Sequence, residues 1–270
     1  MATTQEYVDV AEMGVKTKEE LLALAESAGL SDGPSLSNMR REEILSKIFQ
    51  AASAAQALIA SGVLETMDEG YGFLRQISPE ITTGDVYISQ SQIRRFGLRT
   101  GDTVSGQVRP PKEGERYFGL VRVEKINELD PDQNNSRYRT LFEHMIPIFP
   151  EEQIILETEG NELATRMVDL FAPIGLGQRG LIVSPPKAGK TTMLKQIATG
   201  LVANCSKAIL MVALIGERPE EVTDMRRSVD GEVFASTFDE SVEDQVRVGE
   251  LALERAKRLV EAGRDVEWHN

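Results

Sequence analysis

A short loop between an apolar run and a helical run carries the residue types most suited to chemistry. The loop, residues 184–192, reads SPPKAGKTT. Its second half, Gly189, Lys190 and Thr191, meets the phosphate-loop pattern G-x-x-x-x-G-K-[ST] in the strand-to-helix setting that the pattern requires. The first glycine of the pattern is replaced by Ser184.

The chemistry of phosphate binding explains these residue types. Backbone N–H groups at a helix N-terminus surround an anion, and Gly189 lets the backbone approach a phosphate closely. Lys190 can reach the β- and γ-phosphates, and the hydroxyl of Thr191 can ligate Mg²⁺. A chance Gly-Lys-Thr at a helix start is the alternative, but both flanks are correct, so we expect a purine nucleotide site. Its residues would be Ser184, Pro185, Pro186, Lys187, Ala188, Gly189, Lys190, Thr191 and Thr192.

A carboxylate suited to catalysis follows the next apolar run, residues 208–214. Glu217 lies nearest to the end of that run. In phosphate-loop folds the exit of this strand faces the phosphates, so a carboxylate there could orient and deprotonate the attacking water. Glu217 and Lys190 are therefore the candidate catalytic residues, although spacing alone does not separate this role of Glu217 from a structural one. The acids at residues 220–224 fall in the next predicted helix, where capping and solvation explain them better.

Aromatic and basic residues gather in the middle of the chain. Six of the 15 Trp, Tyr and Phe residues fall within residues 71–118, and residues 91–126 hold eight Lys and Arg against four Asp and Glu. Exposed aromatic rings stack single-stranded bases at about 1–3 kcal/mol each, while nearby cations follow the phosphates. The pattern therefore favours nucleic-acid binding. Basic candidates in this stretch are Arg94, Arg95, Arg109, Lys112 and Arg116.

The alternative is that these rings form the core of a sheet. Tyr71 and Phe73 are two residues apart, so on a strand they share one face. Glycines on both sides of Tyr71 leave room for a base, which favours exposure of this pair. For Phe96 and Phe118 we expect burial in the core.

Four segments of different character must position these residues. Residues 1–62 are predicted to form a small all-α module, and residues 63–128 contain about five short strands, typical of an OB or cold-shock β-barrel. Residues 129–150 are polar and read as a linker. Residues 151–270 alternate strand-like and helical runs, with a first strand at Leu181–Val183, which indicates a parallel α/β sheet.

Composition excludes several classes of protein. The formal net charge is −13, so the chain as a whole is not a polyanion-binding protein, although a local basic patch remains compatible with that total. One cysteine and two histidines exclude a disulfide framework and a Cys-based zinc site. The longest apolar run is far shorter than the ~18 residues of a membrane span. The N-terminus lacks an apolar signal region, so we expect a cytoplasmic protein without membrane partners.

Long segments of the chain resemble a known family. They are GYGFLRQ at residues 70–76, VYISQSQIRRFGLRTGD at 86–102, RPPKEGERYF at 109–118, GQRGLIVSPPKAGKT at 177–191 and ERPEEVTDM at 217–225. In this order they resemble the bacterial Rho family of transcription termination factors, and the resemblance runs from about residue 15 to Val266. A small residue other than glycine is usual in this family at the position of Ser184.

The resemblance implies an RNA-dependent ATPase and helicase, a hydrolase acting on ATP with Mg²⁺. It implies a ring-shaped homohexamer that moves along nascent RNA and displaces RNA polymerase. It implies a RecA-like ATPase domain, in which Lys187, Lys190 and Thr191 would bind the phosphates and Mg²⁺, Glu217 would activate water and Arg218 would lie beside it. The matching positions of its primary site for C-containing single strands are Tyr71, Phe73, Arg75, Tyr87, Glu115, Arg116 and Tyr117. Glu115 would accept a hydrogen bond from the cytosine amino group.

The end of the sequence departs from this family. The family continues from the position of Val266 through an apolar strand to an aspartate that supports Mg²⁺, whereas here Glu-Trp-His-Asn follows. We therefore expect a partial ATPase domain. The alternative function is a truncated RNA-binding fragment without ATPase or helicase activity.

Overall fold

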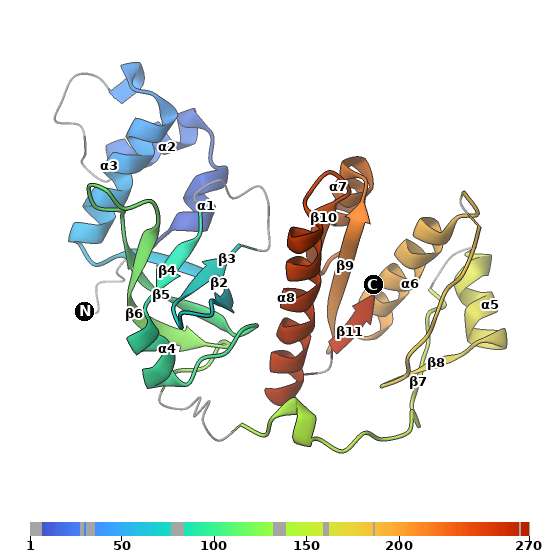
Figure 1. Cartoon of the computed structure of the whole chain (residues 1–270). Coiled ribbons are helices and arrows are strands. Elements are labelled where there is room, and N and C mark those ends of the chain that lie inside the picture. The colour runs from blue at the N-terminus through green and yellow to red at the C-terminus, as the bar shows by residue number, and fades with distance from the viewer. Residues whose placement is uncertain are drawn as a thin grey trace, which may run out of the picture. The chain divides into compact units, whose positions relative to one another are not determined.

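The computed structural model describes residues 7–27, 30, 36–76, 84–131, 139–158, 162–185, 187–264 and 266–269. The chain divides into two units, Met1–Tyr138 and Arg139–Asn270 (Figure 1). The first unit holds small helices and a β-barrel, and the second holds a small parallel sheet with helices.

Helices open the first unit. Its first elements are β1 (Val8–Asp9), α1 (Val10–Val15), α2 (Lys18–Ser27), a 3₁₀ turn (Leu36–Asn38) and α3 (Arg41–Ala54). Asp9 caps α1 by accepting a hydrogen bond from the N–H of Ala11. The buried side of α3 includes the pairs Ile44 and Ile48, and Leu45 and Phe49, whose spacing of four residues places them on one helix face.

Five strands form the barrel, as the sequence predicts. They are β2 (Leu58–Thr66), β3 (Gly72–Arg75), β4 (Val86–Ile88), β5 (Thr103–Arg109) and β6 (Phe118–Ile126), with α4 (Gln90–Phe96) between β4 and β5. The order is β2-β3-β4-β6-β5, and pairing of β2 with β5 closes the barrel. The β4–β6 pair is parallel and the other barrel pairs are antiparallel. Closure leaves no long unpaired strand edge in the barrel.

Helices and barrel share one hydrophobic core. Phe49 of α3 contacts Phe118 of β6 edge to face, with ring centroids 5.4 Å apart. The expected boundary at residue 62 falls inside β2, which begins at Leu58 and also pairs with β1. The helices therefore pack on the barrel as part of the same unit.

The second unit alternates helices and strands. Its elements are a 3₁₀ turn (Phe142–His144), β7 (Gln153–Ile154), α5 (Leu163–Phe171), β8 (Ile174–Gly175), α6 (Lys190–Asn204), β9 (Ile209–Glu217), α7 (Pro219–Ser228), β10 (Glu232–Thr237), α8 (Val242–Glu261) and β11 (Val266–His269). Strands β10, β9 and β11 form a parallel sheet in that order. This confirms the predicted α/β class. Residues 266–269, which are not an apolar run, nevertheless pair with β9.

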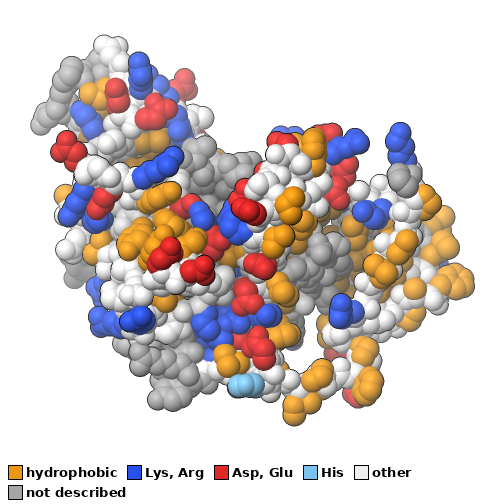
Figure 2. Space-filling model, in the orientation of Figure 1, with side chains coloured by type: hydrophobic (Ala, Val, Ile, Leu, Met, Phe, Trp, Pro, Cys, Tyr) orange, Lys and Arg blue, Asp and Glu red, His pale blue; other side chains and the backbone are white. Residues whose placement is uncertain are grey.

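The strand expected at Leu181–Val183 does not form. These residues have no regular structure, and the side chains of Leu181 and Val183 are 88% and 80% exposed. A strand requires a neighbouring strand for its N–H and C=O groups, and no strand of the described residues pairs with this segment. In Figure 2 hydrophobic side chains also gather on the surface of this unit around α5.

Part of the predicted linker is anchored within the second unit. The N–H of Phe142 donates to Glu261 Oε1 at 2.9 Å, which joins the 3₁₀ turn to the end of α8. Lys257 Nζ lies 3.6 Å from Glu143 Oε1. The segment after Arg139 therefore belongs to the second unit rather than to a free connection.

Candidate functional site

Four aromatic rings come together on the outside of the barrel, and we call Tyr71, Phe73, Tyr87 and Tyr117 the aromatic face. Phe73 and Tyr87 are directly paired across β3 and β4, while their strand neighbours Leu74 and Val86 point into the core. The ring centroids of Tyr71 and Phe73 are 5.8 Å apart, those of Tyr71 and Tyr87 5.7 Å, and those of Phe73 and Tyr117 4.9 Å.

The aromatic face lies outside the hydrophobic core. Tyr87 is 40% exposed and Tyr117 is 38% exposed, and the other two rings are half-buried. The prediction that Tyr71 and Phe73 share a face is confirmed. Phe118 is buried in the core as expected, and Phe96 packs against that core while remaining half-buried.

Arg75 borders the aromatic face and is held by two carboxylates. Its Nε donates to Glu65 Oε2 at 2.5 Å, and its Nη1 forms an ion pair with Asp85. Its guanidinium lies 5.2 Å from the centroid of the Phe73 ring. Burial alone lowers the pKa of Arg75, but the hydrogen bond to Glu65 and the charge of Asp85 outweigh it, so the pKa lies above its ordinary value.

Glu115 is also paired, and its partner is one of the predicted RNA-binding cations. Arg109 donates from Nη1 to Glu115 Oε2 at 2.5 Å and from Nη2 to Oε1 at 2.9 Å. The N–H of Lys112 donates to Oε2 at 3.1 Å. The hydrogen bond from Arg109 and that from the Lys112 backbone lower the pKa of Glu115 to about 2, so the carboxylate is ionised at neutral pH.

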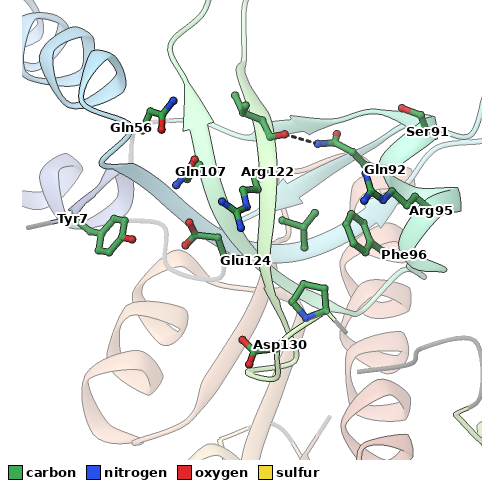
Figure 3. Close-up of a pocket in the computed structure, with 13 residues that line it drawn as sticks. Tyr7, Gln56, Ser91, Gln92, Arg95, Phe96, Gln107, Arg122, Glu124 and Asp130 are labelled. Atoms are coloured by element: carbon green, nitrogen blue, oxygen red, sulfur yellow. Dashed lines mark hydrogen bonds between the residues drawn. The ribbon is translucent and has the colours of Figure 1, made fainter. Parts of the chain in front are cut away.

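Two of the predicted cations lie on α4 instead. Arg94 and Arg95 are exposed in the last turn of this helix, and the Arg95 guanidinium lies 5.3 Å from the Phe96 ring. Figure 3 shows that Arg95 and Phe96 border a groove that also contains Arg122 and Glu124 of β6. The groove has a volume of about 1020 Å³, and none of the four rings of the aromatic face lines it. Arg116, also predicted, is exposed one residue before Tyr117.

The predicted phosphate loop has the backbone of a tight turn leading into α6. Lys187 and Gly189 have φ angles of 63° and 92°, in the left-handed region. Such a φ is easy for Gly189 and costly for a lysine. Helix α6 begins at Lys190, and the N–H of Met193 donates to the Gly189 carbonyl at 2.9 Å. Pro186, which the sequence places in this site, lies outside the described residues.

A cavity of about 420 Å³ brings the predicted catalytic residues together. Lys190 and Thr191 of α6, Glu217 at the end of β9 and Glu221 of α7 all line it. The opposite wall is apolar and includes Leu181. The hydroxyl of Thr191 and the carboxylates of Glu217 and Glu221 supply oxygen atoms, the ligand type that Mg²⁺ prefers. Mg²⁺ needs few protein ligands where phosphates supply the others.

Several other predicted residues of the nucleotide site do not line this cavity. Lys187, Ala188 and Thr192 are exposed, and so is Arg218, which precedes α7 as its N-cap residue. Ser184 Oγ is buried without a hydrogen-bond partner in the part of the chain that the structure describes. The acids of α7 differ in position, because Glu221 lines the cavity whereas Asp224 forms an ion pair with Lys195.

Two kinds of feature are absent from the described residues. No group of three or more His, Cys, Asp and Glu side chains there is placed to hold a metal ion. None of the helices within the described ranges is long and apolar enough to cross a membrane.

Comparison with known proteins found two matching family models. Residues 60–132 match the family described as Rho termination factor, RNA-binding domain, and residues 164–268 match the ATP synthase alpha/beta family, nucleotide-binding domain. The chain is homologous to the Rho termination factors, at about 50% identity over most of its length. The sequence therefore holds a segment that matches the Rho RNA-binding domain, followed by a segment that matches a nucleotide-binding domain.

The similar proteins are longer than this chain. Transcription termination factor Rho of Bacillus subtilis is 53% identical over 85% of this chain and 54% of its own length. The Rho proteins of Buchnera aphidicola and Escherichia coli K12 are 50% and 49% identical over 92% of this chain and 59% of theirs. The chain thus spans 54–59% of the length of these relatives.

Proposed function

We propose that the chain binds C-containing single-stranded RNA on its aromatic face, as part of an ATP-driven RNA translocase of transcription termination. The observation that carries this proposal is the gathering of four partly exposed rings beside paired charges on one side of a barrel. Rings on the outside of a barrel add little to its core. They offer flat surfaces on which bases stack.

The charged groups beside the rings suit the reading of a base. Arg75 keeps donors for a base acceptor or a phosphate, and Glu115 offers acceptors to an amino group such as that of cytosine. A carboxylate has about four acceptor positions. Three hydrogen bonds from Arg109 and Lys112 occupy Glu115, which leaves one position, on Oε1, for a base.

The second unit would supply the nucleotide chemistry of this function. Lys187, Lys190 and the loop backbone would bind the phosphates of ATP. Glu217 would orient the attacking water and accept its proton, and Arg218 would lie beside it. Mg²⁺, held by the phosphates and the Thr191 hydroxyl, would neutralise charge during phosphoryl transfer. The common cavity of Lys190, Thr191 and Glu217 supports these roles.

Assembly and partners follow from the same proposal. Proteins similar to this chain carry the name transcription termination factor Rho. We propose a homohexameric ring that contains this chain's two domains, acts on nascent RNA and displaces RNA polymerase. Such a role places it in the cytoplasm, where bacterial RNA is made.

One observation favours a second function, RNA binding without ATP turnover. Leu181 and Val183 precede the phosphate loop, and they are exposed outside any sheet. A loop whose leading segment is not paired in a sheet lacks one of its two anchors, so its backbone N–H groups are not held toward a phosphate. In this reading the chain binds RNA as a fragment without ATPase or helicase activity.

Two measurements on the 270-residue chain test these functions. Fluorescence anisotropy with oligo(C) and oligo(A) of equal length tests RNA binding, and we expect oligo(C) to bind more tightly, with an affinity that falls steeply with salt. Equal binding of both oligomers would contradict the proposed RNA site. Phosphate release with and without oligo(C) then separates the two functions, because RNA-stimulated turnover supports the translocase and its absence supports the RNA-binding fragment.

A further inference from the structure

We propose that Glu65 is a positioning residue, which holds the guanidinium of Arg75 in the orientation that meets RNA. The inference rests on the proposed function of the aromatic face. Sequence patterns did not single out Glu65, which is buried on β2 beside the aromatic face. Its role would be to act through Arg75.

The strand register places Glu65 and Arg75 on the same face. Glu65 pairs with Phe73 and Val63 pairs with Arg75 across β2 and β3, so Glu65 and Arg75 are diagonal neighbours. Diagonal neighbours on one face are within reach of long side chains. Phe73 in turn pairs with Tyr87 on β4. Glu65 on β2, Phe73 on β3 and Tyr87 on β4 therefore lie side by side across three neighbouring strands.

The contacts of Arg75 fix the plane of its guanidinium. Nε is held by Glu65 of β2, and Nη1 is held by Asp85, which directly precedes β4. The ring of Phe73 lies 5.2 Å from the guanidinium carbon. Two anchored nitrogens and a ring leave little rotation about the Arg75 side chain. Nη2, the third nitrogen, takes part in neither of these two bonds.

Burial makes Glu65 the firmer of the two anchors. The side chain of Glu65 is 11% exposed, whereas that of Asp85 is 27% exposed. A buried carboxylate is screened little by water and needs a partner, so its ion pair with Arg75 is persistent. An arginine held in this way loses little conformational entropy when it binds a ligand. We infer that Glu65 raises RNA affinity without contacting RNA.

A double-mutant cycle on the full chain tests this inference. The variants are Glu65→Leu, Arg75→Ala and the double variant, with Glu65→Gln as the conservative change. Glu69→Gln is the matched control. Glu69 is an exposed acid in the turn between β2 and β3, and its replacement removes the same charge nearby. We expect Glu65→Leu and Arg75→Ala each to raise the Kd for oligo(C) about tenfold, with less than a twofold further change in the double variant. Glu65→Gln should fall between wild type and Glu65→Leu.

The outcomes separate positioning from folding. An undiminished effect of Glu65→Leu in the Arg75→Ala background, or no effect of Glu65→Leu on Kd, would overturn the inference. The ¹⁵N–¹H signal of Arg75 Nε gives a readout that needs no RNA, and we expect rapid solvent exchange of this proton in Glu65→Leu but not in Glu69→Gln. Slow exchange in folded Glu65→Leu would also overturn it. Failure of the wild-type chain to bind any RNA would instead refute the proposed function.

Discussion

Replacement of Tyr87 by alanine removes one exposed ring of the aromatic face and tests whether that face binds bases. Tyr87 is 40% exposed, and its ring contacts Tyr71 at 5.7 Å and Phe73 at 6.1 Å between centroids. Stacking of one base contributes about 1–3 kcal/mol. At about 1.4 kcal/mol per tenfold, the loss corresponds to roughly a 5- to 150-fold rise in Kd for oligo(C). Two aromatic contacts at about 0.5–1.5 kcal/mol each would lower the free energy of unfolding by about 1–3 kcal/mol.

Tyr7 provides a matched control for this experiment. It is 49% exposed on the same unit and has no ring contact among the described aromatic residues. Fluorescence anisotropy with labelled oligo(C) gives Kd, and urea denaturation of each variant gives stability. We expect Tyr7→Ala to bind like the wild type. Equal losses of affinity in Tyr7→Ala and Tyr87→Ala, or no loss in Tyr87→Ala, would refute the assignment of bases to this face.

Three further predictions concern other parts of the chain. Lys190→Ala should abolish binding of a fluorescent ATP analogue and leave the Kd for oligo(C) unchanged; a parallel loss of RNA binding would contradict separate sites. Arg109 holds the pKa of Glu115 at about 2 instead of 4.5. The ion pair therefore stabilises the fold above about pH 4.5, and this stabilisation is lost as the pH falls toward 2. Arg109→Ala should move the ¹³C NMR titration midpoint of the Glu115 carboxyl toward 4.5, and an unmoved midpoint would exclude Arg109 as the cause. Gly106→Ala should lower the free energy of unfolding in urea by about 1–3 kcal/mol, because its Cβ would lie 2.0 Å from the Arg122 carbonyl oxygen, and wild-type stability would show that the strands can separate.

Local patterns were sufficient to predict the five barrel strands and half of the aromatic face. Alternation with a period of two residues placed Tyr71 and Phe73 on one face, and this holds because side chains alternate along any strand. The loop before α6 was also predictable from a local pattern, because glycine, lysine and threonine at a helix N-terminus are typical of a phosphate loop. Glu217 was predicted to belong to this site because it comes shortly after an apolar run, and it lines the same cavity as Lys190.

Pairing between distant segments was not predictable in this way. Glu65 and Asp85 meet Arg75 only through the register of β2, β3 and β4, which no single segment contains. Arg109 reads as a free cation in the sequence, but the turn that follows β5 brings Glu115 back to it. The unpaired state of Leu181–Val183 depends on the absence of a partner strand among the described residues, which local apolar character does not reveal.

Ultraviolet crosslinking of oligo(C) to the 270-residue chain, with mass spectrometry of the crosslinked peptides, tests the central claim most directly. If the aromatic face binds RNA, crosslinks form at Tyr71, Phe73, Tyr87 and Tyr117, and none form at the comparably exposed Tyr7. Crosslinks confined to α4, to Tyr7 or to the second unit would contradict RNA binding by the aromatic face.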